Sequence, residues 1–481
     1  MAQQAITYGT VPNDRTGMTL REATKRAHEN FTDLYTQFGG LAGSAAATAA
    51  GEAARRRLGD EEGALALFTG QSAAALDYAT TKSYLGRPSG LVPITRASNA
   101  SFRGRDGVFR TALSNEGRYS YDRVTRRPKG LRIERAATNL FVQSKNIGTT
   151  GWTVGRATVN DAAAADIFGG ITATELIEDT TALLSHYVAQ SLTPAASTEY
   201  TMSFVAQANT RTEFGVIISS GFNGVSQTAH FDTVTGVAST IAGTVVVGME
   251  DLGGGFWLCR ATATSGMAPS LSTFYITLAS GGTIYYSGDG VSSGYVSDAQ
   301  LETGPVATSR IATTTTSATR AADAVSALLS TIPFSSGGFT GVVDFEVATV
   351  AVGGQRAVNV SDGGSPNLVE VTSLSGTPTS LSLLVSSGGV SQTNISLTTS
   401  LAVGTRYRVA FSVSTNDVRV AMNGALIGTD TSVVLPVGLT KLTVGNNGGG
   451  SGGLNGSVRE AAVVTRVYDN TDLIALSVIP A

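Results

Sequence analysis

The spacing of hydrophobic positions along the chain changes from helical to alternating near residue 90. Before that point, Thr19-Leu20-Arg21-Glu22 fits a capping box, in which the Thr hydroxyl and the Glu carboxylate each satisfy a free amide of the first helical turn. Apolar or small residues then recur four and three positions apart, at Leu20, Thr24, Ala27, Phe31, Leu34 and Phe38. Gly39-Gly40 ends this seam. The pattern predicts an amphipathic helix within an N-terminal segment, residues 1–40.

Two interpretations of this helix stay open. The four-three spacing is typical of a coiled coil, which would make five of its positions oligomerisation residues. These are Leu20, Ala27, Phe31, Leu34 and Phe38. Fewer than three heptads are too short to hold a coiled coil alone, so the alternative is a helix packed on its own chain. Two further helices, predicted at 41–58 and 72–84, make residues 41–90 a helical stalk or collar.

After residue 90, hydrophobic and polar residues alternate in short runs separated by Gly, Asn and Asp. Examples are Tyr200–Gln207 and Phe274–Leu278. Many short strands at such spacing are the signal of an antiparallel sandwich. We therefore expect a first β-sandwich over residues 141–310.

A second alternating region follows a Thr-rich, polar linker at 311–322. Within it, Val418–Met422 precedes Asn423-Gly424, the dipeptide preferred in a type I′ hairpin turn. We expect a second sandwich over 323–481, able to fold by itself because the linker before it has no apolar face. The predicted fold class is mainly β: a short N-terminal α-helical anchor and stalk, then two antiparallel jelly-roll sandwiches.

Composition supports a β protein with few charges. Charged residues make up 14% of the chain, against roughly a quarter in an average soluble protein. A net charge of −3 favours neither a nucleic acid nor an anionic membrane as the main partner. The start, Met1-Ala2-Gln3-Gln4, lacks the basic and apolar regions of a signal peptide, and no apolar stretch approaches 18 residues. We expect folding in a cytoplasm, no membrane insertion, and a buried, unreactive Cys259.

Residues 91–140 form an arginine-rich segment, which we expect to be an extended lead-in module. Positions 96–135 hold 11 of the 33 basic residues of the chain and only four acidic ones. One interpretation is a polyanion site. The preferred one is a surface loop whose arginines pair with carboxylates or carbonyls of neighbouring subunits, because stacking aromatic residues are not interleaved with them.

Residues for catalysis are sparse. The three histidines, His28, His186 and His230, lack the spacing of a zinc helix, and the single cysteine excludes a CxxC motif. No GxSxG stands at a strand-to-helix turn. Paired glycosidase carboxylates stay open, although the acidic residues are scattered. We expect no enzymatic activity, no cofactor and no metal site.

A binding role is left, and sugars are held by flat aromatic faces and planar amides. The candidate ligand residues are Tyr285, Tyr286 and Asp289, and, less strongly, Asn446 and Asn447 before a Gly-rich stretch. The asparagines could also simply supply turn geometry. Both tryptophans, at 152 and 257, lie next to strand patterns, so a core position is preferred over a ligand platform.

The N-terminal segment contains Gly9–Gly17 (GTVPNDRTG), Leu20–Ala23 (LREA) and Glu29–Tyr35 (ENFTDLY). Together these stretches closely resemble a short motif widespread in phage tail-fibre and appendage proteins. The usual pattern has Gly where this chain has Arg15.

Two further resemblances concern the sandwiches. A module that leads into carbohydrate-binding-like jelly rolls of phage structural proteins is similar to Ile94–Phe102, Gly130–Leu140, Gly255–Arg260, Ser287–Gly290 and Ala299–Gly304. A concanavalin/laminin-G-type sandwich is similar to Arg406–Phe411, Val420–Gly424 and Leu454–Glu460. The resemblances cover about two thirds of the chain and imply no catalytic residue.

Together the resemblances imply a tailed-bacteriophage fibre or spike protein, assembled into the virion in the host cytoplasm. Its N-terminal segment would contact other virion proteins, and its sandwiches would bind a host surface polysaccharide. Phage fibres of this kind are usually homotrimers. The rival readings are a purely structural decoration protein of head or tail, and a glycan depolymerase or esterase.

Overall fold

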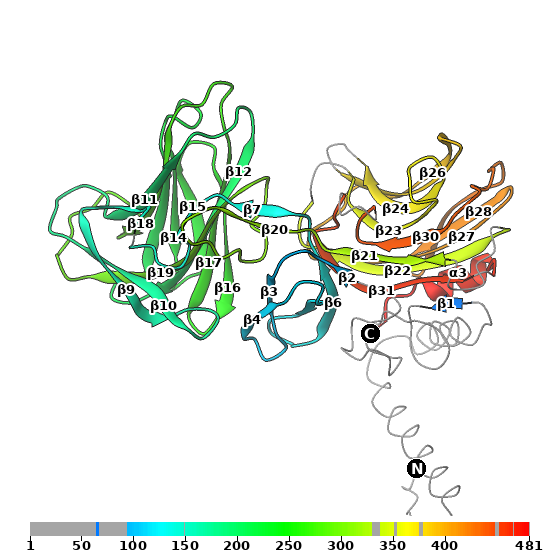
Figure 1. Ribbon diagram of the computed structural model, residues 1–481, viewed down its shortest axis with the longest axis horizontal. Helices are drawn as coiled ribbons and strands as arrows, with labels where there is room; N and C mark the ends of the chain where they lie inside the picture. Colours follow the sequence, from blue (N-terminus) through cyan, green and yellow to red (C-terminus); the bar gives the residue numbers. More distant parts are fainter. Residues whose placement is uncertain are drawn as a thin grey trace, which may run out of the picture.

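The computed structural model describes residues 64–66, 94–148, 150–329, 337–350, 354–374, 379–447, 452–464 and 466–480. The predicted N-terminal helix, with Leu20, Ala27, Phe31, Leu34 and Phe38, lies outside these residues, and so do the two helices expected in the stalk. The described part is mainly β and consists of two sandwiches joined by a narrow waist (Figure 1).

The first sandwich has two six-stranded antiparallel sheets. One has the order β16-β17-β12-β19-β10-β9, with bounds Val246–Gly253, Phe256–Thr264, Glu199–Ala208, Ser293–Thr303, Ile171–Glu178 and Ala157–Ala165. The other has the order β15-β14-β13-β18-β11-β8, with bounds Val237–Ala242, Gln227–Asp232, Glu213–Ile218, Ser272–Ala279, Tyr187–Leu192 and Thr153–Gly155. The predicted runs 200–207 and 274–278 lie within β12 and β18.

The core of the first sandwich follows from alternation along the strands, because successive side chains of a strand point to opposite faces. On β12, Met202, Phe204 and Ala206 are fully buried between the two sheets. The other face of β12 is covered as well: Arg310 donates to the Ser203 hydroxyl, and Val205 packs in a cluster with Ile167, Leu252 and Phe109. A strand buried on both faces marks the side on which the rest of the molecule packs.

The second sandwich also has two antiparallel sheets. The first has the order β29-β28-β27-β22-β31-β6-β5, with β1 also on β31, and the bounds Ala425–Asp430, Asp417–Met422, Arg406–Ser414, Phe339–Val347, Gly456–Val464, Pro128–Ile133, Tyr119–Tyr121 and Ala64–Ala66. The second has the order β2-β21-β30-β23-β24-β25-β26, with bounds Ile94–Thr95, Ala324–Leu328, Lys441–Val444, Arg356–Ser361, Leu368–Leu374, Ser380–Ser387 and Val390–Thr398.

The predicted hairpin turn after β28 is confirmed. Asn423 and Gly424 have φ values of 50° and 85°, the left-handed region that a type I′ turn requires at both positions. Asn is one of the few side-chain residues that adopt this region readily.

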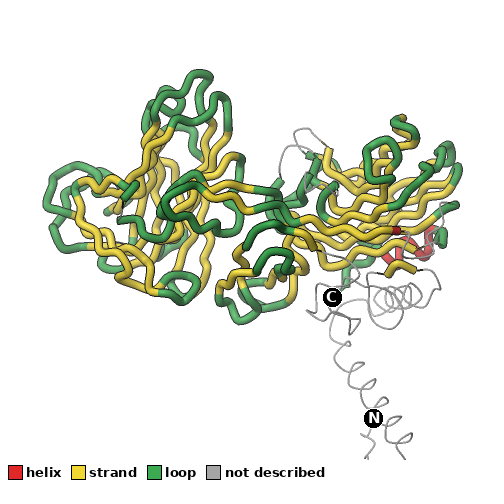
Figure 2. The backbone as a smooth tube through the Cα atoms, viewed as in Figure 1, coloured by secondary structure: helices red, strands yellow, loops and turns green. Residues whose placement is uncertain are grey.

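One helix occurs in the described part of the chain, α3 (Asn470–Leu476), and it covers the outer face of the β27-β22-β31 sheet (Figure 2). The Asp469 side chain caps it by accepting from the Asp472 amide. Leu473 and Leu476 pack on the outward side chains of the sheet, among them Val342. This cover explains why every residue of β22 is buried.

The arginine-rich segment belongs structurally to the second sandwich. Its strand β6 pairs with β31 between Leu131 and Val458, and β2 pairs with β21 between Ile94 and Val325. The second sandwich is thus not confined to residues 323–481, because both of its sheets also include strands from residues 94–133. The order of elements along the sequence does not indicate this pairing, because the first sandwich is inserted between the two parts of the chain that form the second sandwich.

The inserted sandwich is connected to the rest by two antiparallel strands, β7 (Ala137–Asn139) and β20 (Ala318–Arg320). Strand β20 lies in the segment 311–322, which was expected to be a polar linker. That segment is packed instead: Ile311 and Arg320 are both buried. A separate hairpin, β3 (Ala100–Arg103) and β4 (Phe109–Ala112), lies below the waist.

A network of buried charges holds this junction together. The Asp323 carboxylate bonds to Arg118 and, at 2.8 Å, to Nη1 of Arg96. Glu134 accepts from Nη1 of Arg118 at 2.8 Å and from the Ser309 hydroxyl at 2.6 Å. Buried charges need such complete pairing, since an unpaired ion costs several kcal/mol away from water. The network joins the arginine-rich segment to both ends of the inserted sandwich.

Candidate functional site

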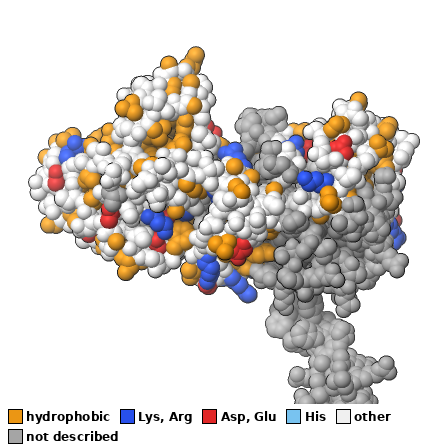
Figure 3. Space-filling model, viewed as in Figure 1, with side chains coloured by type: hydrophobic (Ala, Val, Ile, Leu, Met, Phe, Trp, Pro, Cys, Tyr) orange, Lys and Arg blue, Asp and Glu red, His pale blue; other side chains and the backbone are white. Residues whose placement is uncertain are grey.

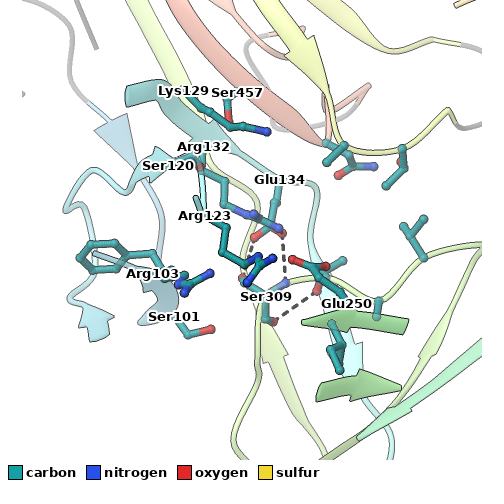
Figure 4. Close-up of a pocket in the computed structure, with 18 of the residues that line it drawn as sticks. Ser101, Arg103, Ser120, Arg123, Lys129, Arg132, Glu134, Glu250, Ser309 and Ser457 are labelled. Carbon is teal, nitrogen blue, oxygen red and sulfur yellow. Dashed lines mark hydrogen bonds and ion pairs between the residues drawn. The ribbon is translucent and has the colours of Figure 1, made fainter. Parts of the chain in front are cut away.

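A cleft of about 410 Å³ lies where the arginine-rich segment meets the two sandwiches (Figure 4). Ligand pockets commonly have volumes of roughly 300–1,000 Å³, so a short stretch of sugars fits in this space. We call it the waist cleft and define it by the polar side chains that line it: Ser101, Arg103, Ser120, Tyr121, Asp122, Arg123, Lys129, Arg132, Glu134, Glu250, Arg260, Thr308, Ser309, Arg310, Glu346, Thr349, Asn455 and Ser457.

The arginine-rich segment forms one wall. The β3–β4 hairpin packs against the outer face of the first sandwich through Phe109, which contacts the apolar cluster around Val205 and Leu252. This packing positions Arg103, whose guanidinium lies 5.9 Å from the centre of the Phe109 ring. Figure 4 shows Arg103, Arg123 and Arg132 reaching from this wall toward Glu250 and Ser309.

The outer face of the first sandwich forms the opposite wall. Glu250 on β16 is exposed, and Arg260 on β17 lies across the backbone of Gly248 on the neighbouring strand. A Cβ at Gly248 would come within 3.4 Å of the Arg260 guanidinium, so glycine leaves room for the long side chain. Leu252 and Leu258 add apolar surface to this wall.

The floor comes from the connecting segment and from the second sandwich. Arg310 is 8% exposed, and it donates to the carbonyls of Asp298 and Thr308 and to the Ser203 hydroxyl. On the other side Lys129 pairs with Glu346 at 2.8 Å. These two cations are therefore engaged in holding the floor.

The remaining arginines of the cleft are less completely paired with carboxylates than Arg310 and Lys129 are bonded. Arg132 pairs with Glu134 at 2.7 Å, and Arg123 pairs with Asp251 at 2.7 Å, with 43% of the Arg123 side chain exposed. Within the described residues, neither Arg103 nor Arg260 has a carboxylate within ion-pair distance. Burial, with the guanidinium groups of Arg126 and Arg123 nearby, lowers the pKa of Arg103. Cations are thus gathered here more closely than carboxylates.

This arrangement can bind a hydroxylated ligand through several kinds of contact. Guanidinium groups donate fixed, planar pairs of hydrogen bonds, and Glu250 can accept from hydroxyls. Ser101, Ser120 and Ser457 can do either. Phe109 and Tyr121 add aromatic surface. The donors and acceptors match the alternating hydroxyl and ring faces of a carbohydrate.

The structure places Tyr285, Tyr286 and Asp289 together, on a loop of the first sandwich away from the waist cleft. Tyr286 is 8% exposed and its hydroxyl donates to Glu178 at 2.6 Å. Arg211 also pairs with Glu178, at 2.6 Å, and its guanidinium lies 5.0 Å from the Tyr286 ring centre. Tyr286 is therefore part of a packed, internally bonded cluster, which disfavours it as a ligand platform.

The neighbours of Tyr286 differ in their exposure. Tyr285 is 48% exposed and can contact solvent. The carboxylate of Asp289 accepts from the amides of Val291 and Ser292, at 2.9 and 2.7 Å, and these bonds hold the loop in its turn. Asp289 acts as a turn residue here.

Asn446 and Asn447 lie in the second sandwich and are not brought near the tyrosine loop. Asn446 is fully buried and donates to the Asp323 carbonyl at 2.9 Å, which makes it a structural residue; Asn447 is exposed. The preferred core positions of the tryptophans agree with the structure. Trp152 is 8% exposed, and Trp257 packs against the first core.

Sequence reasoning missed the cleft residues, above all Arg103, Glu250 and Arg260. The high density of arginine at 96–135 was the available signal, but it mixes two populations. Arg96 and Arg118 are buried and pair with carboxylates of their own chain, whereas the preferred interpretation placed such pairs on a surface loop against neighbouring subunits; Arg103 faces the cleft. Glu250 and Arg260 come from strands more than 100 residues later.

Further observations concern Cys259, metal ligation and membrane-spanning helices. Cys259 is fully buried, and burial raises the pKa of its thiol. Among the described residues, no group of three or more His, Cys, Asp or Glu side chains is placed to hold a metal ion. Nor does the described part contain a helix long and apolar enough to cross a bilayer.

Comparisons with known proteins return structures and no sequence family. No protein-family model matches the chain, and no curated protein matches it. A sialyllactose-bound CBM40 module of a Ruminococcus gnavus IT-sialidase is similar over 30% of this chain and 83% of its own, at 16% identity and a TM-score of 0.26.

Two tandem-domain structures match over more of the chain. Domains LG4-5 of the mouse laminin alpha1 chain cover 60% of this chain and 90% of their own, with 11% identity and a TM-score of 0.21. The CBM22-1-CBM22-2 tandem of Paenibacillus barcinonensis Xyn10C covers 69% and 99%, with 9% identity and a TM-score of 0.24. Because these TM-scores are low, the fold is assigned from the sheets described above and not from these similar structures.

Proposed function

We propose that this protein is an attachment protein of a virion, which binds a host-surface glycan in the waist cleft without cleaving it. The observation that carries the proposal is the cleft itself: a volume of about 410 Å³ with guanidinium groups, a carboxylate, hydroxyls and aromatic rings on its walls. The resemblance of the N-terminal segment to phage tail-fibre proteins supports the virion part of the proposal.

Buried ion pairs beside the cleft support a binding role. Arg118 and Glu134 of the arginine-rich wall pair with each other, and Arg118 also pairs with Asp323 at the start of the second sandwich, which holds these two parts of the chain together. A preformed site loses little conformational entropy when a ligand binds, which matters for a shallow sugar site with few contacts. Binding without domain closure fits a protein that presents its site to a surface.

The engagement of the titratable groups supports binding without hydrolysis. Glu134 lies in the buried network, Lys129 and Glu346 pair with each other, and Asp122 accepts from the Thr125 amide and hydroxyl, which leaves Glu250 as the one unengaged carboxylate among the described residues of the cleft. The two described histidines lie outside the cleft: His230 bonds Glu213 at 2.8 Å, and Nδ1 of His186 lies 2.7 Å from the Arg156 carbonyl oxygen. A glycosidase needs an acid and a second carboxylate on either side of the scissile bond.

A glycan array of purified bacterial surface polysaccharides tests the proposal directly. We expect binding of at least one polysaccharide, with no reducing ends or shorter chains released from it over hours. Release of products would make the protein a depolymerase. An array without any bound glycan would favour the rival reading, a structural decoration protein.

Variants locate the site. Glu250→Ala removes an exposed acceptor, and a lost hydrogen bond to a charged group weakens binding by about 10-fold or more. Tyr285→Ala is the matched control, because Tyr285 is exposed and lies outside the cleft. The reverse pattern, loss with Tyr285→Ala alone, would move the site to the tyrosine loop.

A further inference from the structure

The surface beside the waist cleft carries arginines that no carboxylate neutralises. Side chains of Arg105, Arg126 and Arg127 form no ion pair or hydrogen bond with the described residues, and Arg103 bonds only the Gly107 carbonyl, at 3.1 Å. Arg105 and Arg126 line a shallow depression next to the cleft. Figure 3 shows Lys and Arg side chains gathered at the edge where β3 and β4 lie.

These arginines form a continuous surface with the cleft. The groups that disfavour protonation of Arg103, after burial, are the guanidiniums of Arg126 and Arg123, which places the three charges within mutual electrostatic range. Arg123 in turn lines the cleft. We call Arg103, Arg105, Arg123 and Arg126 the basic strip; Arg123 in it is paired with Asp251, and Asp106 and Arg110 share the outer depression as an ion pair.

We propose that the glycan of the waist cleft is an acidic polysaccharide, whose carboxylates bind Arg103 and Arg260 in the cleft and continue along the basic strip. This inference rests on the proposed glycan-binding function and adds the chemical class of the ligand. A repeating polymer suits a strip, since successive acidic sugars can meet successive guanidinium groups.

The physical reason is the cost of like charge in a confined space. A cluster of guanidiniums is repulsive in itself; burial is the main reason that the pKa of Arg103 is lowered, and the guanidiniums of Arg126 and Arg123 lower it further. An anion relieves the repulsion and accepts paired, charge-assisted hydrogen bonds, the strong kind in water. A neutral sugar would leave Arg103 and Arg260 without a directly paired carboxylate, since Glu250 and Asp251 act on Arg103 only from beyond ion-pair distance.

The cleft also favours a polysaccharide over a nucleic acid. Glu250 is exposed on the wall facing the strip, and Asp122 lines the same space. Both would repel a phosphodiester at every nucleotide, yet both can accept the hydroxyls of a sugar. A mixed lining of cations and acceptors therefore matches a ligand with some acidic groups and many hydroxyls.

The test uses the full chain, the polysaccharides bound on the array, and the same polysaccharides after chemical reduction of their carboxyl groups to alcohols. We expect the bound glycans to be acidic, and carboxyl reduction to weaken binding by at least ~10-fold, the loss typical of one charge-assisted contact. Equal binding of the reduced form, or hits among neutral glycans only, would overturn the inference while leaving the proposed function intact. No bound glycan at all would overturn both.

Variants and a competing polyanion complete the design. Arg103→Gln and Arg260→Gln should each weaken binding about 10-fold. Arg419→Gln is the matched control, because Arg419 is partly exposed, pairs with Asp417 and lies on β28 away from the cleft. Melting temperature and circular dichroism identify a variant that has not folded, in which case the reduced polysaccharide decides alone. Tighter binding to a 20-nucleotide DNA than to any polysaccharide would contradict the assignment.

Discussion

Arginine has two distinct roles in this protein. Arg96, Arg118 and Arg408 are almost completely buried, and each pairs with carboxylates at 3.1 Å or less. Arg103 and Arg260 face a solvent-filled space without such partners. The planar guanidinium serves both roles because it keeps its charge when buried and donates in a fixed geometry. The first group fixes the fold, and the second is available to a ligand.

Removal of one buried charge should be costly. Asp323→Asn keeps the shape but leaves Arg96 and Arg118 with less negative charge beside them. Breaking a buried pair in this way destabilises a protein by about 3–5 kcal/mol. Urea denaturation should show that loss, whereas Arg110→Gln, which breaks an exposed pair with Asp106, should leave the denaturation midpoint nearly unchanged because solvent screens that pair. Equal effects of the two variants would count against the network.

The same network predicts acid sensitivity. Burial opposes ionisation of Glu134, but the guanidiniums of Arg132, Arg320 and Arg118 outweigh it and hold the pKa of Glu134 well below its usual range. A depressed folded-state pKa gives stability that is fully present above the unfolded pKa of about 4.3 and is lost as pH falls through the folded value. The stability gap between wild type and Glu134→Gln should thus narrow below about pH 4.3 in denaturation curves. A gap that stays constant down to pH 3 would refute this.

The contribution of Asp298 to stability should depend on pH in the opposite direction from that of Glu134. Burial raises the pKa of this carboxyl, so its ionisation near neutral pH opposes folding. Asp298 has a φ of 51°, and asparagine tolerates this left-handed conformation as well as aspartate does. Asp298→Asn should therefore raise the melting temperature at pH 7 and change it less at pH 4. A lower melting temperature at pH 7 would contradict the assignment.

The role of a single residue could not be predicted where its bonding partner lies far away in the sequence. Tyr286 reads as a candidate ligand residue because it stands before a Ser-Gly-Asp-Gly turn. Its hydroxyl bonds Glu178, which lies 108 positions earlier. Asn446 bonds the Asp323 carbonyl across 123 positions. No local sequence pattern indicates such contacts, so the exposure of Tyr286 and Asn446 could not be inferred.

At the level of elements, alternation predicts strands well and their pairing poorly. The runs in β12, β18 and β28 and the turn at Asn423 follow from side-chain periodicity and backbone preference, both local properties. Strand β6 pairs with β31 through Leu131 and Val458, more than 300 positions apart. Nothing in the sequence of either strand specifies that partner, so the insertion of one sandwich into the other could not be foreseen.

The insertion can be tested by removing the first sandwich. Residue Asn139 of β7 faces Ala318 of β20 in antiparallel register, so a two-residue Asn-Gly turn can join them. The shortened protein, 91–139 joined to 318–481, should unfold in one cooperative transition with a β-type circular dichroism spectrum. Residues 323–481 alone should not, because they lack β2, β5 and β6 and leave Asp323 without Arg96 and Arg118. Cooperative folding of 323–481 alone would contradict the conclusion that the second sandwich needs the strands of residues 94–133.

At the level of the whole molecule, the cleft exists because two sandwiches and a connecting segment meet at a waist. A single shallow sugar site binds near the millimolar range, about 4 kcal/mol. Several copies on one rigid stalk raise avidity by roughly 100-fold or more without new contacts. Low charge over both sandwiches also allows copies to stand side by side with little repulsion. Attachment through such weak sites therefore needs several copies of the site, and hence an oligomer.

We predict a homotrimer held by the N-terminal segment with its seam of Leu20, Phe31, Leu34 and Phe38. Light scattering should give the mass of three chains for the full-length protein and of one chain for a protein that starts at Ser89. A full-length monomer would contradict the prediction. A trimer that persists after truncation would place the contact in the sandwiches.

The most direct test of glycan binding in the waist cleft is a crystal structure with a fragment of the polysaccharide bound on the array. The account predicts a sugar ring between Arg103 and Glu250, with an acidic group within hydrogen-bond distance of Arg103 or Arg260. A fragment bound at Tyr285 or beside Asn447, with the cleft unchanged, would contradict it.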